Sequence, residues 1–155
     1  MKNGDKDNKL MLIGRYSVNV GVKGRVAVPV KFRECLGKSA IISQGYEKSL
    51  LLVSRSKWEE LTGFLKDKLL TISPARDTER FLFGSAFEVE FDGQGRIVVP
   101  QELREFAGLN SGVVFLGVGN RVEIWSRENW AKYDQVLKKN IEEIASKLSE
   151  NDHGK

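Results

Sequence analysis

The sequence predicts a mainly β fold with flanking helices, formed by two internal repeats that are related by a pseudo-twofold axis. One observation is that residues 18–29 align with residues 89–100, so that Arg25 falls on Arg96 at an offset of 71 residues. A second is that both copies have the same order of glycine, arginine, an apolar run and proline. Because two copies are too few for a solenoid and each half is too small to be stable alone, the halves are expected to share one core.

The repeat extends beyond the aligned segment. Gly37 falls on Gly108 at the same offset, whereas Trp58 falls on Trp130 at an offset of 72 residues, which one inserted residue explains. Alternating apolar positions predict a first strand with one buried face in each copy, namely Tyr16, Val18 and Val20, then Phe87, Val89 and Phe91. The other expected elements are a second strand after each arginine, a short helix from Pro29 to Gly37 or from Pro100 to Gly108, and strands at 40–43, 50–53, 113–116 and 122–125.

A longer helix is expected after each copy, capped by Ser54 or Ser126. Apolar stripes on these helices are assigned to core packing: Trp58, Leu61, Leu65 and Leu69 on the first, and Trp130, Tyr133, Leu137, Ile141, Ile144 and Leu148 on the second. Ser73 and Pro74 predict the start of a linking helix that runs through Phe83. The expected boundaries are a disordered tail at 1–10, a first repeat at 15–58, linking helices at 59–85, a second repeat at 86–130 and a C-terminal helix at 131–150. Residues 151–155 are also expected to be disordered.

Composition limits the classes of function. The 25 lysines and arginines against 21 acidic residues give a net charge of +4 and a pI of about 9.2, which is compatible with a polyanionic partner. No apolar run is long enough to span a bilayer and no signal peptide is present, so a cytosolic protein without a membrane partner is expected. The single cysteine, Cys35, is expected to be a buried and inert thiol, and the single histidine, His153, lies near the chain end. We therefore predict no enzyme, no cofactor, no small-molecule substrate and no zinc site.

Three carboxylates share one face of a predicted strand and are the remaining candidates for metal or acid–base chemistry. Glu88, Glu90 and Asp92 follow the two-residue period of a strand. The first copy has serine, asparagine and glycine at the corresponding positions, which favours a solvent-facing strand edge. No catalytic or metal-binding residue is assigned.

The turns of the two copies carry the strongest candidate site. Arg25 follows Lys23 and Gly24, and Arg96 leaves the corresponding turn of the second copy. A guanidinium group at such a turn can reach a phosphate, or the O6 and N7 atoms of guanine, and the glycine lets the backbone approach closely. Each arginine could equally close its own turn by pairing with a carboxylate such as Asp92. The spacing alone leaves both alternatives open.

These residues resemble the MraZ family, whose members are similar to two SpoVT-AbrB-type halves fused in one chain. The resemblance runs from about Met11 to about Leu148 and is carried by residues 22–29, 33–34, 84–86, 92–100 and 123–125. It implies a swapped-hairpin, AbrB-like β-barrel and protomers that assemble into a ring. It also implies a nucleoid-associated transcription regulator that represses or modulates the operon for division and wall synthesis by binding repeated promoter elements in double-stranded DNA.

The Asp-x-x-Gly-Arg motif of the family is complete in only one copy. It is Asp92, Gly95 and Arg96 in the second copy, and Gly21, Gly24 and Arg25 in the first. If the aspartate orients its arginine, Arg25 lacks that restraint and should lose more side-chain entropy when it docks, at a cost of about 1 kcal/mol.

The resemblance implies DNA contacts by Lys23, Arg25 and Arg96, with Arg15 as a further candidate, and supporting roles for Gly24, Asp92 and Gly95. Because Gln94 stands where the first copy has Lys23, the copies are expected to divide the contacts. A function of another class remains open, an antitoxin-like module whose helices carrying Trp58 or Trp130 neutralise a protein partner.

Overall fold

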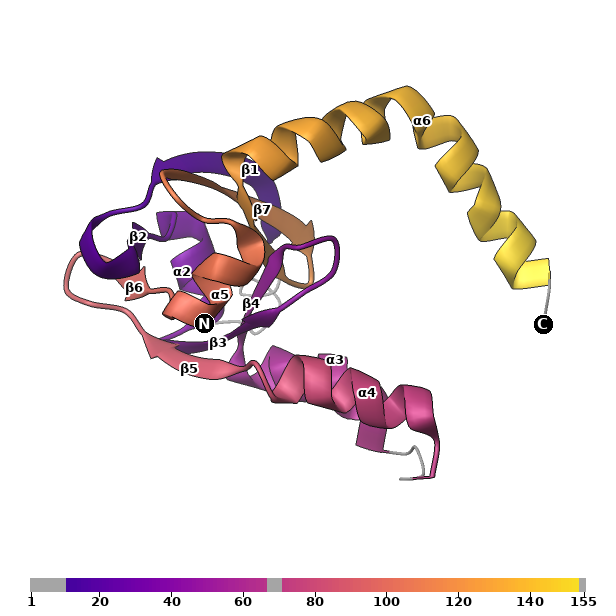
Figure 1. Cartoon of the computed structure of the whole chain (residues 1–155), viewed down its shortest axis with the longest axis horizontal. Helices are drawn as coiled ribbons and strands as arrows, with labels where there is room; N and C mark the ends of the chain where they lie inside the picture. Colours follow the sequence, from indigo (N-terminus) through magenta and orange to yellow (C-terminus); the bar gives the residue numbers. More distant parts are fainter. Residues whose placement is uncertain (1–10, 67–70, 154–155) are drawn as a thin grey trace, which may run out of the picture.

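The computed structural model describes residues 11–66 and 71–153 (Figure 1). In chain order the elements are β1 (Leu12–Asn19), the 3-10 turn η1 (Val22–Gly24), β2 (Arg25–Ala27), α2 (Val30–Leu36), β3 (Ser39–Gln44), β4 (Leu50–Ser54), α3 (Arg55–Lys66), α4 (Ser73–Phe83), β5 (Phe87–Glu90), β6 (Arg96–Val98), α5 (Gln101–Ala107), β7 (Gly112–Gly119), β8 (Val122–Ser126) and α6 (Arg127–His153). The strands and helices predicted for both copies are present, and the mainly β fold with flanking helices is confirmed. The predicted tail at 1–10, Leu69 and residues 154–155 lie outside the described residues.

One sheet contains strands from both halves, with the hairpin of each half next to the first strand of the other. The larger sheet has six strands in the order β1-β7-β8-β4-β3-β5, and β2 pairs with β6 in a separate two-stranded ribbon. The first strand of each half pairs with the other half, since β1 lies against β7 and β5 lies against β3. The halves are therefore joined by backbone hydrogen bonds as well as by side-chain packing.

Equivalent residues face each other where the halves meet. Val26 pairs with Ile97 in the ribbon, and Leu51 pairs with Glu123 between β4 and β8, both in antiparallel register. Such pairing of equivalent positions is what a local twofold axis produces. The register also refines the predicted insertion of one residue. Ala40 and Val113 occupy equivalent places, at an offset of 73 residues, so the second copy has two extra residues before β7 and one fewer in the hairpin that follows.

One shared core lies between the sheet and the elements on one of its faces. Its fully buried side chains come from the ribbon, from α2 and α5, and from the central strands, and include Val26, Phe32, Ile42, Leu50, Ile97, Leu103, Phe115 and Ile124. Burial of such a side chain stabilises the fold by about 1.5–3 kcal/mol. Because both halves contribute to the same cluster, neither half would retain a complete core by itself.

The other face of the sheet carries two smaller clusters. Trp58, Leu65 and Leu82 of α3 and α4 cover the first half, and Trp130 of α6 packs with Trp125 on the second. Both predicted serine caps are confirmed, because the Ser54 and Ser126 hydroxyls accept the N–H groups of Lys57 and Asn129.

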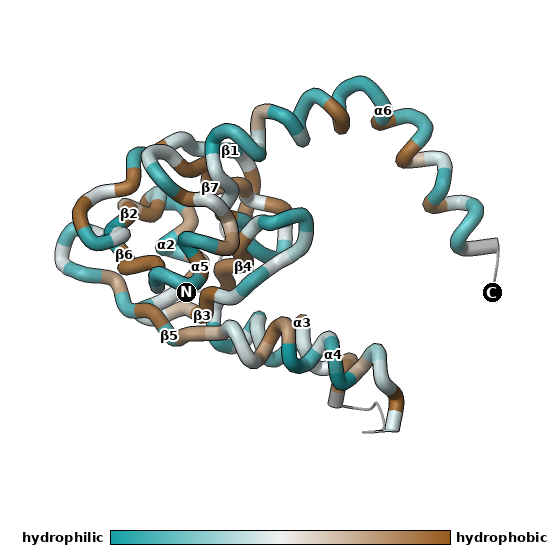
Figure 2. Tube along the Cα trace, viewed as in Figure 1, coloured by the Kyte–Doolittle hydropathy of each residue, from teal (hydrophilic) through white to brown (hydrophobic). Residues whose placement is uncertain are grey.

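The distal part of α6 corrects two predictions. Trp130 is buried and Tyr133 and Leu137 are partly buried, but Ile141, Ile144 and Leu148 are 52%, 40% and 69% exposed, so core packing was wrong for the end of this stripe. Residues 151–153, expected to be disordered, belong to the helix. At 27 residues the helix is about 40 Å long. The helix is longer than the sheet face that it covers, and its apolar stripe continues beyond the body of the molecule, formed by the two sheets with α2 and α5 (Figures 1 and 2).

The alternation predicted for the first strand of the second copy is only partly confirmed. Val89 is buried and Phe91 partly buried, but Phe87 is 39% exposed. Phe87 begins β5 at the edge of the six-stranded sheet, where strands on one side are missing. Glu88, Glu90 and Asp92 are exposed, as expected for a solvent-facing edge.

Candidate functional site

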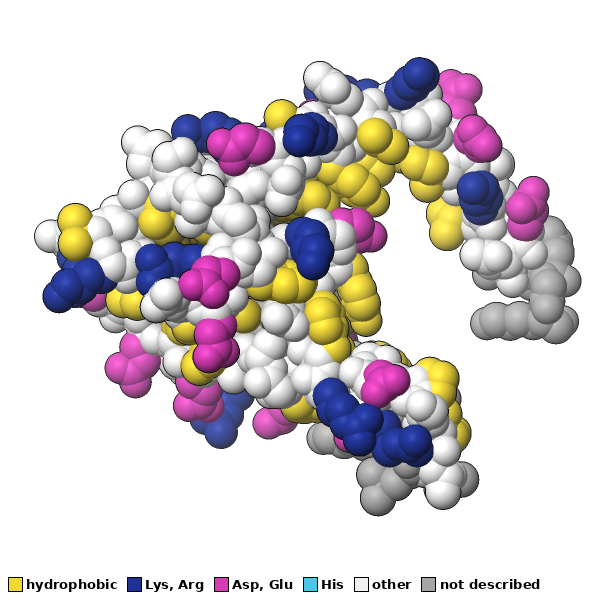
Figure 3. Space-filling view, in the orientation of Figure 1, with side chains coloured by type: hydrophobic (Ala, Val, Ile, Leu, Met, Phe, Trp, Pro, Cys, Tyr) yellow, Lys and Arg dark blue, Asp and Glu magenta, His cyan; other side chains and the backbone are white. Residues whose placement is uncertain are grey.

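The β2–β6 ribbon places the two turn arginines on one surface. In antiparallel pairs, opposed residues share a face, so the pairs Arg25–Val98 and Ala27–Arg96 lie on the same side of the ribbon. Val26 and Ile97 point the other way and are each only 1% exposed. The ribbon lies at the end of the body opposite the tip of α6 (Figure 1), and basic side chains are visible at that end in Figure 3. The local twofold axis thus presents two guanidinium groups on one exposed face.

In the second turn, Asp92 holds both the backbone and the arginine. Its Oδ1 accepts the N–H groups of Gln94 and Arg96, each at 2.9 Å, and its Oδ2 accepts Nε–H of Arg96 at 2.7 Å. The Arg96 and Asp92 side chains are 39% and 36% exposed. The pairing that the sequence left open is therefore present at Arg96, although its guanidinium still reaches the surface.

Asp92 should titrate at lower pH than an ordinary aspartate. The N–H of Arg96, then its guanidinium and the N–H of Gln94, hold the pKa of the Asp92 carboxyl below its usual value, although partial desolvation acts in the opposite direction. Because the unfolded pKa of about 3.9 is higher, this carboxylate stabilises the turn above that pH, and the contribution disappears as pH falls through the folded pKa. A carbon-13 NMR titration of the carboxyl group should give a midpoint below about 3.9, and a midpoint at or above that value would contradict the geometry.

The first turn is closed by the same backbone hydrogen bond as the second but lacks the carboxylate. Gly21 N–H donates to Arg25 O at 2.7 Å, and the corresponding bond from Asp92 N–H to Arg96 O is 2.9 Å. The N–H of Arg25 donates to Val22 O, because no side-chain oxygen is present at position 21. Lys23 takes a left-handed conformation with φ 59° and ψ 27°, which costs a residue other than glycine of the order of 1 kcal/mol. Within the described residues, the Arg25 guanidinium has no hydrogen-bond or ion-pair partner.

Two further arginines, for which the sequence suggested no role, brace the turns reciprocally. Arg33 donates Nε–H to Val28 O and Arg104 donates Nε–H to Val99 O, each at 3.0 Å. The guanidinium of Arg33 lies against Gly95 of the second copy, and that of Arg104 lies against Gly24 of the first. The repetition of Arg33 at Arg104 was the only signal for this contact. Each turn is therefore held by a helix that follows the other turn in sequence.

Gly95→Ala should destabilise the protein by about 2–3 kcal/mol, because it strains the backbone and displaces a hydrogen-bonded arginine. The φ of Gly95 is +75°, and a Cβ there would clash with the guanidinium of Arg33. Gly93→Ala is the matched control, since a Cβ at Gly93 has no atom within 4 Å and its φ is not positive. The midpoint of urea unfolding should fall for Gly95→Ala and stay at the wild-type value for Gly93→Ala. Equal midpoints for the two variants would contradict this account.

Arg15 lies on β1 and contacts α6, not the ribbon. Its Nη1 is 3.1 Å from Oδ2 of Asp134, and its guanidinium lies 5.4 Å from the ring centroid of Trp130. Lys138, and then Arg15, lower the pKa of the Asp134 carboxyl by hydrogen bonding, partly offset by desolvation. The structure thus brings Arg25 and Arg96 together with Lys23 nearby in the chain, and places Arg15 where it anchors α6.

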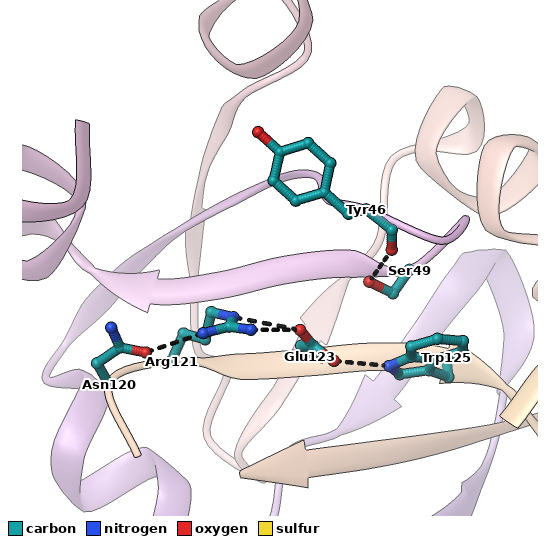
Figure 4. Close-up of polar contacts among 6 residues, drawn as sticks. All are labelled: Tyr46, Ser49, Asn120, Arg121, Glu123 and Trp125. Atoms are coloured by element: carbon teal, nitrogen blue, oxygen red, sulfur yellow. Dashed lines mark hydrogen bonds and ion pairs between the residues drawn. The ribbon is translucent and has the colours of Figure 1, made fainter. Parts of the chain in front are cut away.

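A cavity of about 300 Å³ lies where the halves meet, on the face of the sheet that α3 and α4 cover. It is lined mainly by apolar residues of β4, α3 and the β3–β4 hairpin, with Arg121 and Glu123 of the second half at one side. Glu123 accepts from Nη2 of Arg121 and Nε1 of Trp125, each at 2.9 Å, so that its charge is already balanced (Figure 4). The two charged side chains at this cavity, Arg121 and Glu123, pair with each other, which is typical of a structural junction.

The described residues offer little other chemistry. Across 11–66 and 71–153, no three His, Cys, Asp or Glu side chains are grouped so that they could hold a metal ion. Over the same residues, no helix has the length and apolar character needed to cross a membrane. Cys35, predicted to be buried, is only partly so; desolvation and the neighbouring Glu34 raise the pKa of its thiol, which favours the protonated form.

Fold and site together define a class of protein with two repeats that share one core and present paired arginine turns on an exposed ribbon. A family model described as "MraZ protein, putative antitoxin-like" matches this chain twice, over residues 11–81 and 82–152. The chain belongs to the MraZ family.

Curated relatives extend the match along almost their whole length. The transcriptional regulator MraZ of Caldicellulosiruptor saccharolyticus is 45% identical over 140 residues, and that of Alkaliphilus oremlandii is 44% identical over 140 residues. The protein of the same name from Thermoanaerobacter sp. strain X514 is 41% identical over 140 residues. Each alignment covers 90% of this chain and 98% of the relative.

Proposed function

We propose that this chain is a DNA-binding transcriptional regulator that uses the exposed face of the β2–β6 ribbon to bind repeated promoter elements, and that it represses or modulates an operon for division and wall synthesis. The observation that carries the proposal is the pair of twofold-related arginines, Arg25 and Arg96, on that face. A two-stranded ribbon fits the major groove of B-form DNA, and guanidinium groups suit phosphate and guanine. The relatives named transcriptional regulator MraZ support the same function.

In this proposal Lys23, Arg25 and Arg96 contact the nucleic acid, while Asp92, Gly24 and Gly95 shape the turns that carry them. Lys23 is exposed at the tip of the first turn, one residue before Gly24. Arg15 would have to leave Asp134 before it could reach a phosphate, so its contribution is secondary. No step of this function requires a catalytic residue or a cofactor.

We also propose that several protomers act together, in a ring, and that each folds as a swapped-hairpin barrel. Distal α6 exposes Ile141, Ile144 and Leu148, and the α3–α4 region exposes Phe64, Ile72 and Phe83. Figure 3 shows apolar side chains along the inner side of α6. Because these surfaces lie at different places on one chain, contact between copies would be head-to-tail, which closes into a ring when the rotation permits. Linked protomers raise the effective concentration of later DNA contacts.

An electrophoretic mobility shift with the chain's own upstream DNA tests the function. Duplexes with several promoter elements should bind at least about 100-fold more tightly than a duplex with one element. Neutralising Lys23 with Lys23→Gln should reduce the dependence of log affinity on log salt by about one unit. Equal affinities for one and several elements would contradict the cooperative part of the proposal, and absence of any shift would contradict DNA binding.

A second function, neutralisation of a protein partner, is favoured by the exposed apolar stripe of α6 and by the antitoxin-like description of the family. Extended apolar stripes of this kind are typical of protein interfaces. Recovery of one stoichiometric partner protein that binds α6, without a shift of promoter DNA, would establish this function in place of the first.

A further inference from the structure

We infer that the two turns of each protomer contact DNA by different chemistry, with Arg96 reading one guanine per element while Lys23 and Arg25 contact phosphates. Each protomer would then lie on its element in a single orientation. The inference rests on the proposed DNA-binding function and assigns distinct roles within the same ribbon.

Arg96 is positioned before DNA arrives. Its Nε is occupied by Oδ2 of Asp92 at 2.7 Å, and that carboxylate is itself fixed by two backbone N–H groups. Within the described residues, Nη1 and Nη2 of Arg96 have no partner, so the end of the guanidinium remains available as a two-pronged donor. The O6 and N7 atoms of guanine accept such a pair of donors in the major groove. Discrimination between bases requires a fixed donor geometry, which the carboxylate supplies here.

Arg25 and Lys23 have the opposite character. Position 21 is glycine, so no carboxylate restrains the Arg25 guanidinium, and the backbone bond of its N–H goes to Val22 O. Lys23 adds a second positive charge at an exposed position of the same turn, where the second copy has Gln94. An ammonium group and a guanidinium without a fixed partner bind well to phosphates, because phosphate contacts depend on charge and tolerate variation in geometry.

The difference breaks the twofold symmetry of the ribbon. Two equivalent turns would favour an element with twofold symmetry, since each would present the same donors to the same bases. One base-reading turn and one phosphate-binding turn instead favour direct repeats, each with a guanine on the side of Arg96. Exposed Val98, opposite Arg25 in the ribbon, adds an apolar surface that suits a thymine methyl group.

The test uses the full chain and duplexes of its own upstream region, in which each guanine in turn is replaced by 7-deazaguanine. This replacement removes the N7 acceptor and leaves base pairing intact. At one guanine per element we expect an affinity loss of about 10-fold, because one of two hydrogen bonds to Arg96 is removed. Arg96→Gln should abolish this sensitivity. The matched variant Arg25→Gln should keep it, while lowering affinity for every duplex and reducing the salt slope by about one unit.

Each outcome bears on a different part of the inference. Guanine sensitivity that disappears equally in Arg25→Gln, or that is absent from a wild-type complex that forms normally, would overturn the division of roles while DNA binding stands. Absence of any wild-type complex would remove the proposed function, and the inference with it. Unchanged circular dichroism and thermal midpoints in both variants would show that folding is not the cause.

A gain-of-function variant provides an independent measurement. Gly21→Asp places a carboxylate where Asp92 stands in the second copy; its Cβ would lie 3.2 Å from Arg25 O, a tight contact that a small opening of the turn would relieve. We expect this variant to bind a duplex with an added, twofold-related guanine about 5–10-fold more tightly than the native duplex, whereas wild type should not distinguish the two. A folded Gly21→Asp protein that ignores the added guanine would overturn the role assigned to Asp92.

Discussion

The double charge reversal Arg25→Glu with Arg96→Glu should reduce affinity for promoter DNA by about 1,000-fold or more. Each substitution removes a charge-assisted contact of about 1.5–3 kcal/mol and places a carboxylate against the phosphate backbone. The two contacts amount to about 3–6 kcal/mol, and the added repulsion brings the expected total to about 4 kcal/mol or more, which corresponds to three orders of magnitude in dissociation constant. Fluorescence anisotropy with labelled upstream DNA at one fixed salt concentration would measure the loss.

Arg55→Glu is the control for the effect of net charge. Arg55 begins α3, far from the ribbon in the chain, and its side chain is 71% exposed in a surface pair with Glu88. Since exposed ion pairs contribute little to stability, this variant should fold normally and lose little affinity beyond a small salt-dependent effect. Comparable losses in Arg55→Glu and the ribbon variant would show that the protein responds to net charge and not to contacts at the ribbon.

If copies assemble through α6 as proposed, the double substitution Ile141→Glu with Ile144→Glu should dissociate the proposed oligomer and reduce binding to DNA with several elements by about 100- to 10,000-fold. Both side chains are exposed on distal α6, where a second copy would bury them. A carboxylate in that apolar contact would remain unpaired at substantial cost. Light scattering after size-exclusion chromatography would measure the mass, and affinity for a single element should remain unchanged because the ribbon is untouched.

Gln135→Glu is the matched control, since it also introduces a carboxylate at an exposed position, but on another side of α6. It should keep the oligomeric mass and the affinity of wild type. If the Ile141→Glu with Ile144→Glu variant keeps the oligomeric mass of wild type, the apolar stripe of α6 does not hold the copies together. Loss of mass without loss of affinity for several elements would instead separate assembly from DNA binding.

Local patterns in the sequence were sufficient where neighbouring residues decide the structure. As predicted, α2 and α5 each begin after a proline and end at a glycine, because proline cannot donate a backbone N–H and glycine adopts positive φ at the helix end. The serine caps of α3 and α6 follow from a hydroxyl that reaches an N–H three residues later. The repeat itself indicated the local twofold relation, since equal sequences form equal units.

Contacts between distant segments were beyond the reach of these patterns. The repeated arginines at 33 and 104 were visible, but only the fold shows that each braces the turn of the other half. Arg15 was grouped with the other basic candidates because nothing in its neighbourhood in sequence indicates Asp134, which α6 brings to it. The apolar stripe of α6 was assigned to the core because helical periodicity indicates which face of a helix is apolar, but not what packs against that face.

The amino-acid order by itself determined the duplication, the strands and short helices of each copy, and the presence of an arginine at both turns, since these depend on residues a few positions apart. The tertiary structure decided that both arginines share one exposed face, that Asp92 restrains only one of them, and that α6 extends beyond the body. The physical reason is that register, burial and side-chain pairing arise between segments separated by many residues, and such contacts become defined only when the whole core is assembled.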